Sequence, residues 1–261
     1  MDLPDGLRLV RIVDEPALWR PMNDMCASAW PEFMLHDAVV DRLWGRLLTD
    51  WPEFQAVLVD RDGVVVAAFQ SAPLAWEGSD ASLPAGWDDQ LERAAADHDA
   101  GRVPDTLGAL QINVAAARRG QGLSRVVLDA MRDAGRQAGF ASLIACVRPT
   151  GKARYPLLPI DAYAAWRRPD GRPVDPWLRV HATAGARLVR ASPRSMTIRG
   201  TTAEWSAWTG LAFPATGPYV VEGALTPVDI DVEAGVGVYH DPNVWMVHDL
   251  RPQAGAAARR A

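Results

Sequence analysis

The chain has 261 residues, of which 49% are hydrophobic and 23% are charged, and its formal net charge is −5. This composition is typical of a globular protein and excludes a disordered chain. The acidic balance argues against a nucleic-acid-binding protein, because phosphate binding needs a surplus of positive charge. The sequence has no apolar run of about 18 residues and begins with an acidic segment. We therefore expect neither a membrane span nor a signal peptide.

The cysteines and histidines do not predict a metal site or a disulfide. Cys26 and Cys146 are far apart and stand in apolar surroundings. This spacing favours two reduced, buried thiols and a cytoplasmic protein. His240, Asp241 and His248 lack the tight spacing of metal ligands, so we expect no metal.

Hydrophobic periodicity and turn residues predict the elements of the first half. Two apolar runs on either side of the turn residues 60–63 predict a β-hairpin. The charge run after Trp87 predicts a short surface helix with a solvated face. In order, we expect a strand over 7–13, helices over 15–30 and 38–50, hairpin strands over 56–59 and 64–69, the helix over 87–98 and a strand over 107–114.

The second half begins with the clearest helix of the chain, over 123–138, whose apolar residues recur every three or four positions. Gly139 ends it, and an almost wholly apolar, central strand follows over 142–147. The pattern is weaker after residue 150, and we expect a disordered tail over 251–261. Between these lie helices over 160–168, 175–184 and 202–208 and short strands over 187–189, 195–198, 219–221 and 244–247.

The most informative segment joins the strand over 107–114 to the helix over 123–138. Its glycines, Gly120 and Gly122, permit positive φ and a close approach of the backbone to a ligand. The first N–H groups of the helix have no partner inside the helix, and the helix dipole adds partial positive charge. Arg118 and Arg119 supply full charges. These features together predict a site for an anion such as a pyrophosphate, although a plain strand–turn–helix connection has a similar pattern.

The residues Arg119-Gly120-Gln121-Gly122-Leu123-Ser124 resemble the Gln/Arg-x-x-Gly-x-Gly/Ala signature of the GNAT superfamily of acyl-CoA N-acyltransferases. Ser124 departs from it, since the signature has Gly or Ala there. The order of predicted elements over residues 7–149 is also similar to that family. The resemblance implies an α/β fold with a mixed, mostly antiparallel central sheet flanked by helices.

The resemblance also implies that acetyl-CoA or another acyl-CoA binds as co-substrate. Its pyrophosphate is expected on residues 119–124, and its pantetheine arm in a wedge between the strands over 107–114 and 142–147, which splay apart. The acceptor is then expected to enter near residues 30–37. The cofactor-binding residues implied in this way are Ile112, Asn113, Val114, Arg119, Gly120, Gln121, Gly122, Leu123 and Ser124.

Catalysis needs a base for the amine and an acid near the leaving thiolate. Members of the family often carry a tyrosine four residues before a Gly-Phe pair, and here His181 stands in that position before Gly185. The resemblance implies that His181 is a proton donor or a base, since an imidazole with a pKa of about 6.5 is partly protonated near neutral pH. Tyr155 is an alternative acid. A histidine packed at a helix end is the competing interpretation.

Two further segments are candidates for the acceptor site. Residues 150–180 form a polar and aromatic insertion, in which Trp177 is expected to contact the acceptor. Glu32 and His36 follow Pro31, where the family places acceptor contacts. The alternatives are a surface excursion with a structural Trp177 for the insertion, and a helix-capping or exposed role for Glu32 and His36. We expect one domain over 1–250, with a core over 7–149 and a C-terminal extension over 199–250.

These expectations combine into a cytoplasmic acyltransferase, monomeric or homodimeric, that acetylates a small-molecule amine and uses no metal. The alternative is a non-catalytic module that binds or senses acyl-CoA. It stays open because Gln111 and Asn113 occupy the strand on which a carboxylate base would be expected. A dinucleotide-dependent oxidoreductase is disfavoured, because the glycine loop has two glycines and no acidic strand end follows it.

Overall fold

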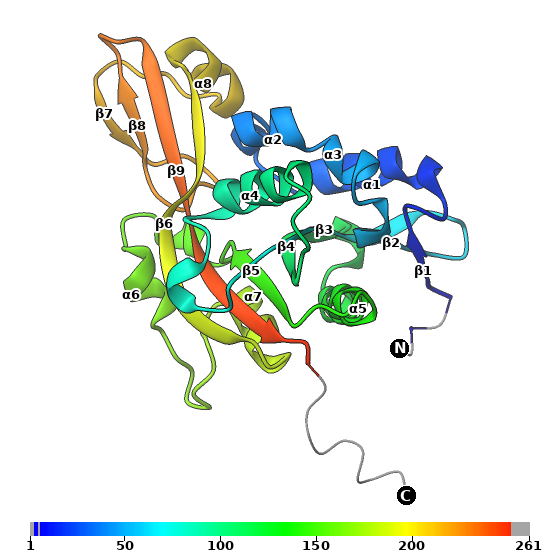
Figure 1. The fold of residues 1–261 in the computed structure, drawn as a ribbon. Coiled ribbons are helices and arrows are strands. Elements are labelled where there is room, and N and C mark those ends of the chain that lie inside the picture. The colour runs from blue at the N-terminus through cyan, green and yellow to red at the C-terminus, as the bar shows by residue number, and fades with distance from the viewer. Residues whose placement is uncertain (1–2, 5, 252–261) are drawn as a thin grey trace, which may run out of the picture.

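One mixed β-sheet with helices on both faces forms the body of the protein (Figure 1). The computed structural model describes residues 3–4 and 6–251. The sheet has nine strands in the order β1-β2-β3-β4-β5-β9-β8-β7, and β6 pairs with the other edge of β9. The tail that we expected to be disordered, residues 251–261, lies outside the described residues except for Arg251.

The first five strands create a wedge in the sheet. β4 and β5 are parallel and pair only from Thr106 with Ser142 to Ala109 with Ala145. β4 continues to Val114 without β5 as a partner, whereas the other strand pairs are antiparallel. The predicted mixed, mostly antiparallel sheet with two splayed strands is therefore confirmed. The bounds are β1 Arg8–Arg11, β2 Gln55–Val59, β3 Val65–Leu74, β4 Thr106–Val114 and β5 Ser142–Val147.

The helices cover both faces of this sheet. α1 to α4 lie on one side, and α5 lies on the other (Figure 1). α5 packs with Leu123, Val127 and Met131 buried in the main core, as its periodicity predicts. The helices are α1 Trp19–Ala27, α2 Ala38–Leu43, α3 Arg46–Thr49, α4 Trp87–Asp99, α5 Leu123–Gln137, α6 Ile160–Ala164, α7 Pro176–Thr183 and α8 Thr202–Thr209.

Four helices differ from the sequence prediction, and one of them, expected over 160–168, ends at Ala164 as α6. The helix over 15–30 is shorter, since α1 ends at Ala27, and the helix over 38–50 is divided into α2 and α3. α4 has the predicted solvent-exposed face, with Glu92 and Arg93 on it, but two acids of its charge run are not solvated. Asp97 is buried and accepts a hydrogen bond from the Ala75 N–H at 2.9 Å, and Asp88 accepts one from the Thr197 N–H at 3.0 Å. These acids accept backbone hydrogen bonds from β6 and from the end of β3. The charge pattern therefore predicted more solvent exposure for Asp88 and Asp97 than they have.

The C-terminal extension is a long two-stranded ribbon with additions at its far end. β6 (Arg187–Thr201) and β9 (Val236–Asp249) are single long strands, where the sequence predicted short pieces. Their pairing shifts register between Ser192 and Met196, around Pro193, which obscures the strand pattern in the sequence. β7 (Gly217–Tyr219), β8 (Val228–Asp231) and α8 complete the part that projects from the body in Figure 1.

The insertion over 150–180 is folded and tied to α7. Asp175 caps α7 by accepting the Trp177 and Leu178 N–H groups at 2.9 and 3.0 Å. Its other oxygen accepts from the Gly151 N–H at 2.8 Å and from the Tyr163 hydroxyl at 2.9 Å. One buried carboxylate thus holds the start and the end of the insertion together.

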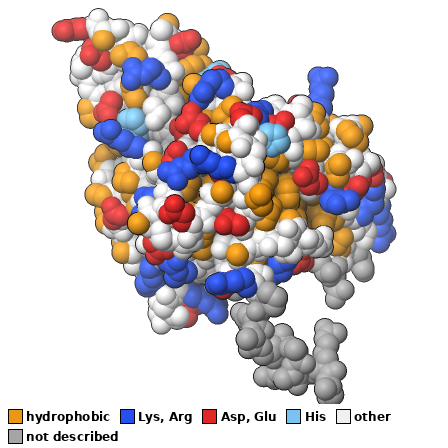
Figure 2. Space-filling view, viewed as in Figure 1, with side chains coloured by type: hydrophobic (Ala, Val, Ile, Leu, Met, Phe, Trp, Pro, Cys, Tyr) orange, Lys and Arg blue, Asp and Glu red, His pale blue; other side chains and the backbone are white. Residues whose placement is uncertain are grey.

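The surface mixes the two signs of charge. On the face shown in Figure 2, Lys and Arg side chains are interspersed with Asp and Glu. Exposed ion pairs such as Arg187–Asp80, at 2.7 Å, join the two signs of charge elsewhere in the described chain as well as in sequence neighbours such as Arg11–Asp14. Within the described residues, every helix falls short of the length and apolar character needed to cross a bilayer.

Candidate active site

A cavity of about 850 Å³ opens where β4 and β5 separate. Residues 111–114 of β4 line one side of it, and residues 145–148 at the end of β5 line the other. Trp30, after α1, and Trp177, on α7, also line it. The cavity therefore occupies the wedge that the sequence predicted for the pantetheine arm, and it brings the insertion and the N-terminal helices to the same place.

The glycine loop has the geometry of an anion site. Gly120 and Gly122 have φ of 78° and 77°, and Gly122 directly precedes α5 without a side-chain cap. The space beside both glycines is open, so their backbone is accessible to a ligand. Arg119 and Ser124 line the cavity, whereas Leu123 packs into the core. The residues present fit a pyrophosphate at the start of α5.

A chain of neutral amides crosses the cavity wall. The amide oxygen of Gln111 accepts from the Trp30 indole at 3.0 Å and from the Asn113 amide at 2.8 Å. Gln111 in turn donates to Gln70, and Gln70 donates to Asn23 at 3.0 Å. Among the described residues, Arg119 and Arg148 are the charged side chains of the lining, which contains no Asp or Glu. The wall thus offers hydrogen bonds but no carboxylate base.

His181 lies in the cavity wall next to a second histidine. It is 2% exposed, and its Nδ1 lies 3.0 Å from Nε2 of His248. Its ring and that of Trp177 are T-shaped to each other, with ring centres 4.5 Å apart. Burial lowers the pKa of His181 well below its usual 6.5, and His248 and Arg132 lower it further. Burial and then Arg132 also lower the pKa of His248, to about 3. His181 is therefore neutral near neutral pH, and not partly protonated as an unperturbed imidazole is.

The environment of His248 selects the tautomer of His181. Nδ1 of His248 is buried and has no hydrogen-bond partner among the described residues. A buried N–H without an acceptor costs more than an unfilled ring lone pair, so His248 carries its proton on Nε2 and donates it to His181. His181 then carries its own proton on Nε2, and it can donate that proton to a ligand in the cavity.

Of the other candidate residues, the structure brings Trp177 to the cavity but not Tyr155, Glu32 or His36. Tyr155 is 46% exposed and packs against Tyr163 and Trp166. Glu32 and His36 pair with each other at 3.1 Å, and His36 stacks on Trp208 of the extension at 4.3 Å. Trp177 does line the cavity. The structure thus leaves Tyr155, Glu32 and His36 apart from the cavity. It brings His181 and Trp177 together there with five of the cofactor residues, Ile112, Asn113, Val114, Arg119 and Ser124.

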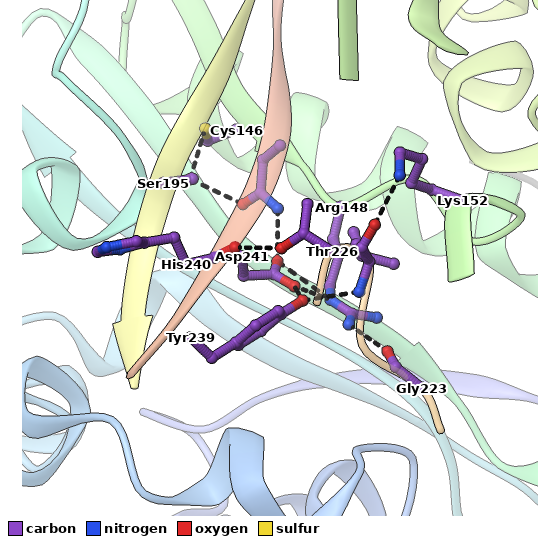
Figure 3. Close-up of polar contacts among 11 residues, drawn as sticks. Cys146, Arg148, Lys152, Ser195, Gly223, Thr226, Tyr239, His240 and Asp241 are labelled. Carbon is purple, nitrogen blue, oxygen red and sulfur yellow. Dashed lines mark hydrogen bonds and ion pairs between the residues drawn. The ribbon is translucent and has the colours of Figure 1, made fainter. Parts of the chain in front are cut away.

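Sequence reasoning missed a buried ion pair at the cavity wall, between Arg148 and Asp241 (Figure 3). Nε of Arg148 lies 2.9 and 3.1 Å from the two oxygens of Asp241, which is fully buried. The sequence feature that could have indicated Arg148 is its position directly after the apolar strand over 142–147. Its partner lies in β9, a strand that the sequence did not predict to reach residue 241.

The comparisons with known proteins agree with this geometry. No family model matches the chain. The arginine N-acetyltransferase avaD of Aspergillus versicolor is 33% identical over 282 residues, which cover 96% of each chain. The loading GNATL domain of CurA from Lyngbya majuscula is 17% identical with a TM-score of 0.57, over 94% of this chain and 96% of that one. The GphF GNAT-like decarboxylase in complex with isobutyryl-CoA is 22% identical with a TM-score of 0.52, over 94% and 99%.

These similarities define the class of protein. The two solved structures show the shared fold, and the relative shows the family: the chain belongs to the GNAT superfamily of acyl-CoA-dependent N-acyltransferases. It is an N-acetyltransferase with acyl-CoA as its co-substrate, as the sequence resemblance implied. The enzyme is thereby favoured over the non-catalytic binding module.

Proposed function

We propose that the acceptor is free arginine or a closely related amino acid, and that the donor is acetyl-CoA. The observation that carries this proposal is similarity to an arginine N-acetyltransferase over 96% of both chains. That span includes the insertion and the extension, which supply Trp177 and Asn243 to the cavity. The relative therefore matches this chain in the segments that surround the acceptor as well as in the CoA loop.

The aromatic part of the cavity supports a guanidinium-bearing acceptor. Trp44 and Trp87 are stacked with ring centres 6.1 Å apart, and both line the cavity. A guanidinium binds well against tryptophan faces, where its charge meets the electron-rich ring. The indole of Trp44 is held in place by Asn23 at 3.1 Å. Such a wall accepts a cation without a carboxylate partner.

The CoA site supports the residue roles that the sequence implied. Backbone N–H groups at Gly120, Gln121 and Gly122 and at the start of α5 would hold the pyrophosphate, together with Arg119. Residues 112–114 of β4 lack a partner on the β5 side and would hold the pantetheine arm. Acyl-CoA supplies the acyl group as an activated thioester, and the thiolate is the leaving group.

His181 is proposed as the group that assists the leaving thiolate. Its neutral imidazole directs Nε2–H into the cavity, because His248 holds Nδ1. A fixed donor in a dry site stabilises negative charge that develops during the reaction. Tyr155 remains the alternative acid and Glu32 and His36 remain acceptor candidates, although all three need a rearrangement to reach the cavity.

The proposal also covers domain organisation, location in the cell and oligomeric state. One sheet runs through the core and the extension, which supports a single domain over 1–250. Cys26 and Cys146 are buried free thiols, which suits a cytoplasmic enzyme. We propose a monomer or homodimer that acts on small molecules and not on nucleic acid or membranes.

Release of free thiol from acetyl-CoA tests this function. The purified protein is assayed with arginine, ornithine, agmatine and a panel of other amines, and mass spectrometry identifies the acetylated nitrogen. We expect acetylarginine as the main product. Tight CoA binding without turnover on any acceptor would contradict the proposal and favour a sensing module.

A further inference from the structure

Arg148, which directly follows β5, is fixed by groups from two distant segments, β9 and the loop at Gly223 (Figure 3). Its Nε–H is shared between both oxygens of Asp241, and its Nη2 donates to the Gly223 carbonyl at 2.7 Å. Asp241 is itself held by the Tyr239 hydroxyl at 2.5 Å and by the Asn243 amide at 2.7 Å. Every oxygen of this buried carboxylate is thus satisfied, and the guanidinium cannot rotate freely.

The opposite edge of the guanidinium is available to a ligand. Within the part of the chain that the structure describes, Nη1 of Arg148 has no hydrogen-bond partner, although Nε and Nη2 do. The guanidinium carbon lies 5.5 Å from the centre of the Trp30 ring, and Arg148 and Trp30 both line the cavity. An arginine stays charged at all physiological pH values, so this edge presents a permanent cation with free donors.

The charge of the cavity lining points to an anionic ligand group at this end. Arg119 belongs to the CoA loop, which leaves Arg148 as the charged side chain of the acceptor end among the described residues. A planar guanidinium with free N–H groups is the preferred partner of a carboxylate, which it binds by charge-assisted hydrogen bonds. Asn243 and Trp30 line the same cavity.

We propose that Arg148 binds the carboxylate of the acceptor, so that the enzyme acetylates amino acids in preference to their amides or decarboxylated amines. This inference deepens the proposed function and rests on it, because the proposed function places the acceptor in this cavity. Arg148 is then a specificity-determining residue, and Asp241 is a positioning residue that orients it. The Trp44 and Trp87 faces receive the other end of the acceptor.

The test compares amino acids with their carboxylate-free counterparts. Arginine, ornithine, glutamine and phenylalanine are each paired with their amides, and agmatine is added as decarboxylated arginine. Turnover is measured with acetyl-CoA, and binding is measured by calorimetry on CoA-saturated protein, so that the result does not depend on turnover. The variant is Arg148→Met. Because it leaves buried Asp241 unpaired, Arg148→Met/Asp241→Asn is measured beside it, and Arg20→Met serves as a matched change at a side chain that is 91% exposed.

The wild type should bind acids about 10- to 100-fold more tightly than amides, as expected for hydrogen bonds to a charged group. In both Arg148 variants this ratio should fall to within about threefold, with CoA affinity unchanged, while Arg20→Met keeps the wild-type ratio. Equal binding of acids and amides by the wild type, a ratio that persists in both Arg148 variants, or no binding by any pair would overturn the inference.

The two proposals fail in different ways. If other amino acids but not arginine are acetylated, with the same preference for the acid, arginine is the wrong acceptor and the role of Arg148 stands. If arginine and argininamide are acetylated equally well, arginine stands as acceptor and the role of Arg148 is overturned.

Discussion

At the residue scale, His181 shows how burial changes the chemistry that a sequence position suggests. Its position before Gly185 implied a partly protonated imidazole, but 2% exposure and the contact with His248 keep it neutral. A neutral imidazole assists as an N–H donor and not as a cationic acid. The pH dependence of the reaction therefore separates the two roles.

We predict that His181→Gln lowers kcat about 10- to 100-fold, because it removes a fixed donor to the developing charge. CoA affinity should change little. Because the pKa of His181 lies well below 6.5, pH–rate profiles of the wild type and the variant should run parallel above pH 6.5. Steady-state kinetics across pH measures this, and His98→Gln is the control at an exposed histidine.

Two outcomes would count against this role. Normal turnover of His181→Gln at saturating substrate would make His181 a packing residue. An inflection of the wild-type pH–rate profile near neutral pH that is absent from the variant would show that the imidazole of His181 titrates during the reaction. The burial of the ring argues against this.

A second residue-scale prediction concerns Gly122. Its φ of 77° is a conformation that side chains rarely adopt, and its open side faces the expected pyrophosphate. Gly122→Val should weaken CoA binding by at least about tenfold, measured by calorimetry. Gly171→Val provides the matched control, since Gly171 has the same φ of 77° and open surroundings in an exposed turn. Retention of wild-type CoA affinity in Gly122→Val would remove the loop from the CoA site.

At the element scale, α2 and α4 meet through two carboxyl groups, the buried Asp37 and the half-buried Asp88. Asp37 caps α2 by accepting the Val39 N–H at 2.8 Å, while Asp88 accepts the Thr197 N–H. Oδ2 of Asp37 and Oδ1 of Asp88 are buried and lack other partners among the described residues. Burial, followed by the charge of Asp37, raises the pKa of Asp88 to about 8. The pair therefore retains a proton in the folded protein.

Asp88→Asn should increase stability at alkaline pH. The folded pKa of Asp88 lies above the unfolded value of 3.8, so its stabilisation is complete below pH 3.8 and is lost as the pH rises through about 8. An asparagine keeps the acceptor for the Thr197 N–H and donates to Asp37 without titrating. Urea unfolding should show the largest gain at pH 8 to 9, and Asp62→Asn in an exposed loop should show none. An equal effect at pH 5 and pH 9 would contradict the shared proton.

The elements that the sequence predicted well are those whose pattern is local. α5 and β5 match their predicted ranges because one is strongly periodic and the other wholly apolar. β6 and β9 were missed as long strands because their register shifts around Pro193. The solvated charge run predicted for α4 was wrong only for Asp88 and Asp97, because these two acids accept backbone hydrogen bonds from other elements, which the sequence of α4 does not reveal.

At the scale of the whole molecule, the cavity combines segments that are far apart in sequence. The CoA loop was predictable because it is a single continuous segment with a glycine pattern. The acceptor end was not, because Arg148 depends on Asp241, 93 positions away, and Trp30 depends on Gln111, 81 positions away. Such pairs follow from sheet order, which places β9 beside β5.

The same long-range packing gives the molecule two opposed responses to pH. His181 and His248 are buried and neutral in the folded state, with lowered pKa values, so they gain protons on unfolding below pH 6.5. Their stabilisation is present above the unfolded pKa and is lost as the pH falls. The carboxyl pair of Asp37 and Asp88 acts in the opposite direction, since unfolding releases its proton between about pH 4 and pH 8.

We therefore predict a stability maximum near pH 6.5 that shifts when either cluster is removed. Below that pH, His181 and His248, with a smaller contribution from the half-buried His240, outweigh one shared carboxyl proton, for a net loss on the order of 1 kcal/mol per pH unit. Asp88→Asn should steepen this acid-side loss and flatten the alkaline side, whereas His248→Gln should make the acid side clearly shallower. Urea unfolding of the three proteins at pH 5, 6, 7 and 8 measures the slopes. Each substitution removes a proton site from only one of the two clusters, so it should change the slope of stability against pH. Parallel curves for all three proteins would therefore show that the two clusters do not titrate on unfolding.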